Sequence, residues 1–274
     1  AVPYAADDQG TDRAEAVAEN AIREIIGTAG RDVYAPFDAQ AADAMARGFL
    51  LGATAGRTTL QGEGLQHQDG HSLVLASTVP PCQAFDPAFA YEVAVIVLQG
   101  MKRMYEDNDE AIYYITLQNE NYPHPAMPKG AEEGIRRGMY LFREGAGKKN
   151  APRVQLLGSG TILREVIAAA ELLENDFGVA SDVWSCPSFN ELRRDGIAAE
   201  RWNLLHPSQT SRKSYVEQCL DGRQGPVIAS TDYMRAFAEQ IRPFVPQRYV
   251  CLGTDGFGRS DYRVALRKFF EVNR

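Results

Sequence analysis

The sequence predicts an α/β protein built from two domains, and three observations support this fold class. With 274 residues, 45% of them hydrophobic, the chain is long enough for two domains that each bury a core. Apolar runs typical of buried strands alternate with segments of helical periodicity. A polar stretch rich in glycine and basic residues, Phe142 to Arg153, interrupts this alternation, which then restarts. We place the linker between the domains at residues 142–151.

The first forty residues contain one expected helix and indicate no chemistry. Between Asp12 and Gly27, apolar residues recur at intervals of three and four, which is typical of an amphipathic helix. Thr11 can cap its start. Residues 1–40 are therefore left unassigned. The chain begins at Ala1 rather than at methionine, so we expect processing, trimming or an incomplete sequence.

Residues 41–141 are expected to form the first α/β domain. Gly48 to Thr54 and Leu73 to Val79 are apolar runs that predict buried strands, with a polar loop between them. Pro87 to Tyr105 predicts a helix, because proline suits the first turn. The strand Ala111 to Leu117 follows, and this order favours a mostly parallel sheet. The expected buried face of the helix contains Phe89, Val93, Ile96, Val97 and Met101.

Residues 152–274 are expected to form the second α/β domain. A strand at Val154 to Leu157 precedes a Gly158-Ser159-Gly160 turn and a helix at Ile162 to Asn175. This turn lacks the third glycine of a dinucleotide-binding loop, which favours ordinary structure. The glycine-rich stretch Gly253 to Gly258 is expected to form a turn at the domain interface. Further strands are expected at Ala180–Ser185, Pro226–Ser230 and Tyr249–Leu252.

Composition excludes several classes of function. A net charge of −7 without a basic stripe disfavours nucleic acid as a partner. No run approaches 18 apolar residues and no signal peptide is present, so we expect no membrane association and a cytoplasmic location. The four cysteines form no C-x-x-C pair, so buried reduced thiols are expected. They are Cys82, Cys186, Cys219 and Cys251.

The densest group of polar residues lies between Arg57 and Ser72 and includes Glu63, His67, Asp69 and His71. A histidine close to a carboxylate suits proton transfer near neutral pH. The alternative is that both histidines are structural or simply exposed to solvent. A metal site is disfavoured, because a spacing of four residues suits a metal only on a helix and Gly70 interrupts the segment.

These residues carry a resemblance to a known family. The run Ala46 to Ser72 resembles, nearly residue for residue, the corresponding loop of the large homodimeric bacterial pyruvate dehydrogenase E1 component. The resemblance extends from about Ala41 to the end of the chain. It continues through Phe85–Glu92, Asn119–Tyr122, Pro125–Ile135, Leu156–Arg164, Ser188–Gly196, Ala229–Met234 and Leu252–Asp261.

The resemblance implies a fold and a function. Residues 41–141 would be the latter part of a thiamine pyrimidine-binding, transketolase-like domain, and 152–274 a transketolase C-terminal-like domain. Family members decarboxylate pyruvate, a 2-oxo acid, with thiamine diphosphate and Mg²⁺, and pass the acyl unit to a lipoyl-bearing E2. The catalytic residues implied are first His71 and then His67, with Glu63 orienting a histidine or holding the loop. The stretch Asn119 to Tyr122 would line the cleft.

The sequence also departs from the family. Leu73 stands where members carry a further histidine, and no Gly-Asp-Gly motif for Mg²⁺ and diphosphate occurs. The glutamate that activates the cofactor lies upstream in the family, and none of Glu15, Glu19 and Glu24 is a convincing substitute. The cofactor would thus be held mainly outside this chain, by a complementary E1 chain, a second protomer or a missing segment, in an oligomer.

Two alternatives remain open at this stage. One is a subunit of a split E1-like enzyme that transfers the acyl unit to a small-molecule acceptor in biosynthesis. The other is a non-catalytic structural paralogue that keeps the domain interface but not the chemistry.

Overall fold

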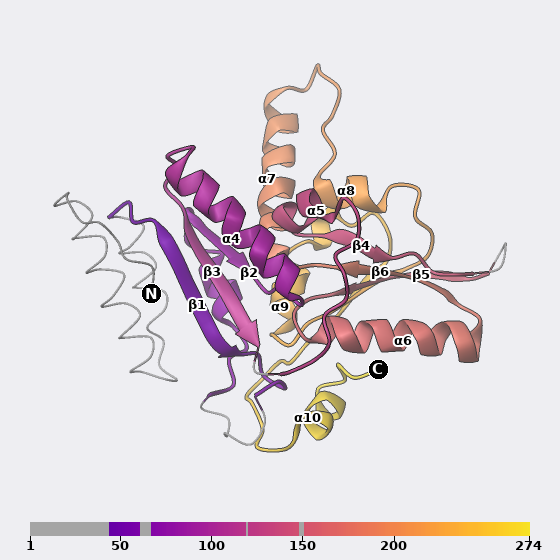
Figure 1. Cartoon of the computed structure of the whole chain (residues 1–274). Coiled ribbons are helices and arrows are strands. Elements are labelled where there is room, and N and C mark those ends of the chain that lie inside the picture. The colour runs from indigo at the N-terminus through magenta and orange to yellow at the C-terminus, as the bar shows by residue number, and fades with distance from the viewer. Residues whose placement is uncertain (1–43, 61–66, 119, 148–150) are drawn as a thin grey trace.

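The computed structural model describes residues 44–60, 67–118, 120–147 and 151–274, whose strands form two sheets (Figure 1). The first sheet has three parallel strands in the order β1-β3-β2. Its strands are β1 (Gly48–Ala55), β2 (Cys82–Phe85) and β3 (Ile112–Gln118). The predictions of strands at Gly48–Thr54 and Ala111–Leu117, and of a parallel sheet, are confirmed.

The second sheet has five strands in the order β4-β6-β5-β7-β8, and only β4 is antiparallel to its neighbour. The predicted strands are confirmed as β5 (Arg153–Gly158), β6 (Ala180–Ser185), β7 (Val227–Ser230) and β8 (Tyr249–Leu252). The strand β4 (Tyr140–Arg143) was not expected, because its four residues are too few to show periodicity. It takes in the first two residues of the expected linker, and the division at 142–151 stays a prediction.

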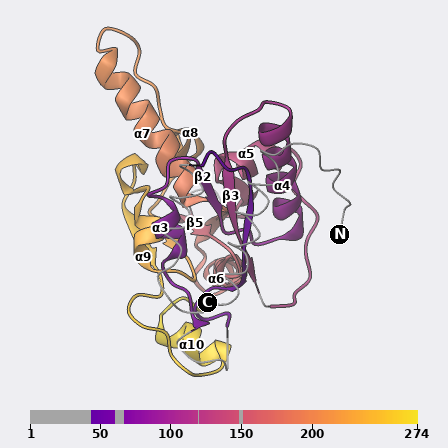
Figure 2. The same ribbon diagram turned by 90° about the vertical axis from the view of Figure 1, so that its left-hand side faces the viewer.

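Helices cover both sheets. Figure 2 shows α4 and α5 on one side of the first sheet, with α3 and α9 on the other, while α7 extends away from the body. Among the described residues, none of the helices is long and apolar enough to cross a membrane. The helices are α3 (Ser72–Ala76), α4 (Ala90–Tyr105), α5 (Ala131–Arg137), α6 (Ile162–Phe177), α7 (Phe189–Leu205), α8 (Tyr215–Leu220), α9 (Arg235–Glu239), the 3₁₀ helix η2 (Arg242–Phe244) and α10 (Arg263–Phe269).

The prediction of a strand at Leu73 to Val79 was wrong, because this run begins with the helix α3. A short apolar run does not by itself distinguish a strand from a buried helix. Asp69 stabilises the start of the helix, because its carboxylate accepts hydrogen bonds from the backbone N–H groups of His71 and Ser72, both at 3.0 Å. The strand that follows the loop is β2, which was missed.

The predicted helix at Pro87 to Tyr105 is confirmed as α4, but its buried face is rotated from the expected one. Met101, expected inside, is 46% exposed. Gly100 allows close contact with the first sheet, because a Cβ atom there would lie 2.7 Å from Phe49 Cζ. The buried residues of α4 are Glu92, Ile96, Gly100 and Met104.

One hydrophobic core joins the two sheets. Leu50 and Ile112 from the first sheet belong to the same buried cluster as Leu157 from the second. Among the described residues the cysteines form no disulfide bond, and all but Cys219 are buried, as expected from the sequence. The contact between the sheets is therefore extensive enough to fix the loops that emerge from them.

A candidate active-site loop and the buried polar junction beneath it

Polar residues at the carboxyl ends of strands from both sheets meet in one buried junction. Asp232, which follows β7, bonds to Thr59, which follows β1. Asp86, which follows β2, accepts a hydrogen bond of 2.8 Å from Ser159, which follows β5. Ligand sites in α/β proteins form at the carboxyl ends of parallel strands. We call these residues, with their direct partners, the polar junction.

Asp232 fixes the backbone that leaves β1. Its carboxylate accepts hydrogen bonds from the backbone N–H groups of Thr58 (2.9 Å) and Thr59 (3.1 Å) and from both of their hydroxyl groups. The side chain of Asp232 is almost completely buried. Gly56 has a positive φ of 88°, and a Cβ atom there would lie 2.4 Å from Asp232 Oδ2. Only glycine fits this turn.

Asp86 is fully buried and bridges the two sheets. Its Oδ1 accepts hydrogen bonds from Thr116 Oγ1 (2.6 Å) and Gln118 Nε2 (2.7 Å), and its Oδ2 accepts one from Ser159 Oγ. Burial raises the pKa of Asp86 to about 7, although the hydrogen bonds from Thr116 and Ser159 oppose the shift. Gly160 N donates to the backbone carbonyl of Asp86. The turn at Gly158–Gly160 thus packs against Asp86. This contact agrees with the expectation that the turn is ordinary structure rather than a dinucleotide-binding loop.

Glu92 is a second buried acid that the sequence did not single out. It accepts hydrogen bonds from Tyr140 (2.7 Å) and Ser185 (2.6 Å) of the second sheet, and from the backbone N–H groups of Ala88 and Phe89. Burial raises its pKa, and these hydrogen bonds oppose the shift. The sequence did contain a signal for this buried acid: Glu92 is a charged residue on the face of the predicted helix that is otherwise apolar. For Asp86, the corresponding signal was a carboxylate directly after a strand.

Arg57 connects the loop to the second half of the chain. Its buried guanidinium donates to the backbone carbonyls of Thr254 and Gly256, in the stretch Gly253 to Gly258 that was expected to form a turn at the domain interface. Burial lowers the pKa of Arg57, and the nearby carboxylates oppose this shift. Gly70 passes directly over Arg57, because a Cβ atom at Gly70 would lie 2.0 Å from Arg57 Nη2. The far end of the loop is therefore held against its start.

The predicted catalytic histidines, His67 and His71, lie on either side of Gly70, in the segment that is held against Arg57. Both side chains are exposed. His67 and His71 flank Asp69, whose carboxylate is used to cap α3. Within the described residues, neither imidazole makes a hydrogen bond, so the structure does not pair them with an acid. The third predicted residue, Glu63, lies outside the described residues.

Within the stretch Asn119 to Tyr122, which was expected to line the cleft, Glu120 and Tyr122 make contacts inside the chain. Glu120 forms ion pairs with arginines, including Arg164. The ring of Tyr122 lies 4.4 Å from the guanidinium of Arg164, and its hydroxyl group donates to the carbonyl of Ala88. Asn119 lies outside the described residues.

The described residues do not fit thiamine diphosphate with its Mg²⁺ ion. Within ranges 44–60, 67–118, 120–147 and 151–274, no group of three or more acidic, histidine or cysteine side chains could hold a metal ion. The sequence has no Gly-Asp-Gly motif. The strand ends that could receive a ligand are filled by the carboxylates and hydroxyl groups of the polar junction. A diphosphate would require ligands from elsewhere.

Comparison with protein families matches both halves of the chain. Residues 30–125 match the pyruvate dehydrogenase E1 component middle domain, a match that begins within the unassigned segment 1–40. Residues 138–273 match the transketolase-like TK C-terminal domain. The family predicted from the loop and from the motifs beyond it is thus confirmed.

Individual curated proteins that resemble this chain support the same family. The pyruvate dehydrogenase E1 component of Pseudomonas aeruginosa is 66% identical over 235 residues, which are 85% of this chain and 26% of that protein. The Escherichia coli K12 protein of the same name is 58% identical, with the same coverage. The chain therefore spans about a quarter of the length of these curated relatives.

Solved structures show the same fold at low sequence identity. Transketolase from Leishmania mexicana superposes with a TM-score of 0.62 at 17% identity, covering 87% of this chain and 30% of the other. A split gene transketolase described as an inactive β4 tetramer gives a TM-score of 0.53 at 19% identity, covering 82% of this chain and 62% of the other. The chain therefore belongs to the pyruvate dehydrogenase E1 family, and its match to the E1 middle domain precedes its match to a transketolase-like C-terminal domain.

Proposed function

We propose that this chain is the part of a thiamine-diphosphate-dependent pyruvate dehydrogenase E1 that carries the histidine loop. The complete enzyme would decarboxylate pyruvate and transfer the acyl unit to a lipoyl-bearing E2. The observation that carries the proposal is the match of Ala46 to Ser72 to the family, together with two exposed histidines on a clamped backbone. The relatives that match this chain at 52–66% identity are all named pyruvate dehydrogenase E1 component.

In this proposal His71, and secondarily His67, bind the carboxylate of the substrate and move protons, while Glu63 orients a histidine or holds the loop. Exposure leaves both imidazoles accessible to a substrate or to another chain. The fixed turn at Gly70 and the cap at Asp69 give the histidines a defined position.

Thiamine diphosphate and Mg²⁺ would be held by a second protomer, a complementary chain or an upstream segment. This assignment follows from the poor fit of the described residues to the diphosphate and its ion. A cytoplasmic location, expected from the sequence, is part of the same proposal.

The two alternatives are less well supported by the relatives, and each has its own test. A split enzyme that uses a small-molecule acceptor predicts turnover without a lipoyl domain, so strict dependence on a lipoyl domain would exclude it. A structural paralogue predicts that loss of His71 leaves the activity of the assembled complex unchanged.

The direct test is pyruvate decarboxylation by the complete enzyme carrying His71→Ala or His67→Ala, with His206→Ala as the matched control. His206 stacks on Trp202 at 4.4 Å, away from the loop. Because a positioned proton-transfer group contributes roughly 10²–10⁴-fold, we expect at least a hundredfold loss of kcat for His71→Ala. Full activity of both loop variants would contradict the proposal, and equal loss in His206→Ala would show that the effect is not specific to the loop.

A further inference from the structure

Gln68 lies between the two predicted catalytic histidines but in the opposite environment. Gln68 is only 5% exposed, whereas His67 and His71 are exposed. A buried amide needs partners for its donor and acceptor groups, because burial removes their hydrogen bonds to water. The partners of Gln68 therefore show to which part of the protein the histidine segment is attached.

The side-chain amide of Gln68 makes two hydrogen bonds to one residue in the second half of the chain. Its Nε2 donates to the carbonyl of Arg259 at 2.7 Å, and its Oε1 accepts from the N–H of Arg259 at 2.8 Å. Nε2 also donates to the carbonyl of Leu60 at 3.3 Å, on the other side of residues 61–66 in the sequence. An amide that pairs with both backbone groups of one residue is fixed in position and in rotation. A single side chain thus connects the histidine segment to Arg259 and to the start of the loop.

The backbone next to Arg259 packs tightly against Gln68. A Cβ atom at Gly258 would overlap Oε1 of Gln68 and would lie 2.9 Å from Cβ of Gln68. Gly258 is not among the glycines with a positive φ. The close contact, rather than the backbone conformation, therefore requires glycine at this position.

The turn that contains Arg259 is supported by its own side chain and by α10. The guanidinium of Arg259 donates from Nη1 to the carbonyls of Phe257 (3.1 Å) and Gly258 (2.9 Å). It also lies 5.1 Å from the centre of the Phe269 ring on α10. The backbone groups that bind Gln68 are thus held in place from the far side.

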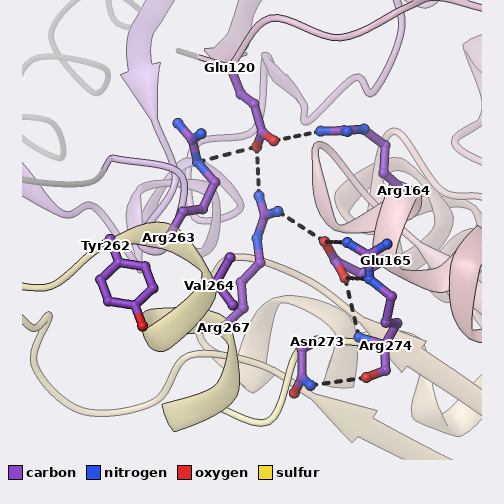
Figure 3. Close-up of a pocket in the computed structure, with 9 residues that line it drawn as sticks. All are labelled: Glu120, Arg164, Glu165, Tyr262, Arg263, Val264, Arg267, Asn273 and Arg274. Carbon is purple, nitrogen blue, oxygen red and sulfur yellow. Dashed lines mark hydrogen bonds and ion pairs between the residues drawn. The ribbon is translucent and has the colours of Figure 1, made fainter.

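The helix α10 is itself fixed to the first sheet and to the start of the loop. Glu120, which follows β3, forms ion pairs with Arg263 at 3.4 Å and with Arg267 at 2.7 Å (Figure 3). Arg263 also donates from Nη2 to the carbonyl of Thr59 at 2.8 Å. Side chains held by several such contacts have little freedom to move. The turn before α10 is therefore a rigid support for the histidine segment.

We propose that Gln68 is a positioning residue for His67 and His71, and that it acts by holding the segment between them against the backbone of Arg259. The inference rests on the proposed function, since the position of the histidines matters only if they take part in the reaction. Proton transfer requires a group within hydrogen-bond reach of its target, and a displacement of about 1 Å can lower a rate roughly a hundredfold. Loss of the bonds to Arg259 would therefore lower turnover although both histidines are present.

The test compares Gln68→Met with Gln247→Met in the complete enzyme, since methionine is close to glutamine in size but has no amide. Gln247 is the matched control, because it is half-buried and its Nε2 also donates to two backbone carbonyls, those of Leu220 and Arg223, both at 3.1 Å. We expect Gln68→Met to lower kcat roughly tenfold to a hundredfold. The KM for thiamine diphosphate should not change, because the proposed function places that cofactor on other residues. Gln247→Met should keep its kcat, although it also removes hydrogen bonds.

Gly258→Ala tests the same contact from the side of Arg259, and does not depend on Gln68→Met folding well. The new methyl group would displace the amide of Gln68, so kcat should fall in this variant too. Because both changes act on one contact, the double variant should lose less than the product of the two single losses. Losses that multiply fully would show that the two changes act independently, and would contradict the proposal.

Hydrogen exchange of this chain gives a readout that needs no turnover. The N–H of Arg259 loses its acceptor in Gln68→Met, so its exchange and that of the peptide His67–Ser72 should become about fivefold faster or more, with no such change in Gln247→Met. Unchanged exchange would overturn the proposed attachment. Full kcat in Gln68→Met, in an enzyme that His71→Ala inactivates, would overturn the positioning role and leave the proposed function standing. Full kcat in both histidine variants would contradict the proposed function and the positioning role with it.

Discussion

The polar junction and the histidine segment lie only a few residues apart in the sequence, yet their environments are opposite. Thr58 and Thr59 are buried and bonded through both their N–H and their hydroxyl groups to Asp232. His67 and His71 are exposed and make no hydrogen bond through their imidazoles within the described residues. We interpret this difference as a division of roles: the junction holds the two sheets together, and in the proposed function the histidine segment would present its side chains to a partner or substrate. Changes to the junction should therefore affect stability, and changes to the histidines should affect turnover.

The largest loss in the free energy of unfolding is expected from Asp232→Ala. This change leaves the buried donors of Thr58 and Thr59 without an acceptor, and each such group costs roughly 1–3 kcal/mol. We expect the free energy of unfolding, measured by urea denaturation, to fall by about 3 kcal/mol or more. Asp255→Ala is the control, since Asp255 is 42% exposed and pairs with the exposed Arg235. A loss below 1 kcal/mol for Asp232→Ala would mean that the junction does not stabilise the fold.

A smaller loss in the free energy of unfolding is expected from Gly56→Ala. The new Cβ atom would meet Asp232 Oδ2 at 2.4 Å, and φ at Gly56 is positive. Gly256 has a similar φ of 83° but nothing within 4 Å of its Cβ position. We therefore expect Gly256→Ala to cost about 1 kcal/mol for backbone strain alone, and Gly56→Ala about 2–3 kcal/mol. Equal values of Tm for the two variants would contradict the close contact.

The next effect is a dependence of stability on pH that arises from Asp86. Because the pKa of Asp86 is about 7 in the folded protein, against a reference value of 3.8, the folded state binds the proton more tightly. This contribution to stability is complete below pH 3.8 and is lost as pH rises through 7, by at most about 1.4 kcal/mol per pH unit. Asp86→Asn cannot ionise, so its stability relative to the unchanged protein should improve between pH 5 and 8. The measurement is urea unfolding of both proteins across that range, and parallel curves would show that Asp86 is not shifted.

The smallest effect on stability is expected from His67→Ala and His71→Ala. Exposed side chains without specific contacts usually change the free energy of unfolding by less than about 0.5 kcal/mol. Thermal unfolding checks this expectation. A loss above 2 kcal/mol in either variant would place that histidine among the structural residues and remove the contrast with the junction.

The sequence predicted the parts of this molecule that depend on local patterns. The strands at Gly48–Thr54 and Ala111–Leu117 were found because the first is an apolar run and the second is rich in β-branched and aromatic residues. The run after His71 was assigned as a strand because the capping role of Asp69 does not show in apolar periodicity. Short strands such as β4 depend on pairing with a distant partner, here β6, which a single sequence does not reveal.

The junction was harder to predict than the loop above it. His67 and His71 attract notice by residue type, and the resemblance to the family supported them. Asp86 and Asp232 become partners of Ser159 and Thr59 only when strand ends more than 70 residues apart meet, and no spacing in the sequence encodes that meeting. The structure shows how the described ends of the loop are held, at Arg57 to Thr59 and at Gly70, while the catalytic assignment of its histidines stays a prediction.

The most direct test of the account is a chimeric enzyme. The E1 component of Pseudomonas aeruginosa would receive the 235 matched residues of this chain in place of its own, and pyruvate decarboxylation would be measured with thiamine diphosphate and Mg²⁺. We predict kcat within about tenfold of the parent enzyme, a difference of about 1.4 kcal/mol in barrier, and its loss on His71→Ala but not on His206→Ala. A folded chimera without turnover, or one that His71→Ala leaves fully active, would contradict the claim that this chain carries a working E1 histidine loop.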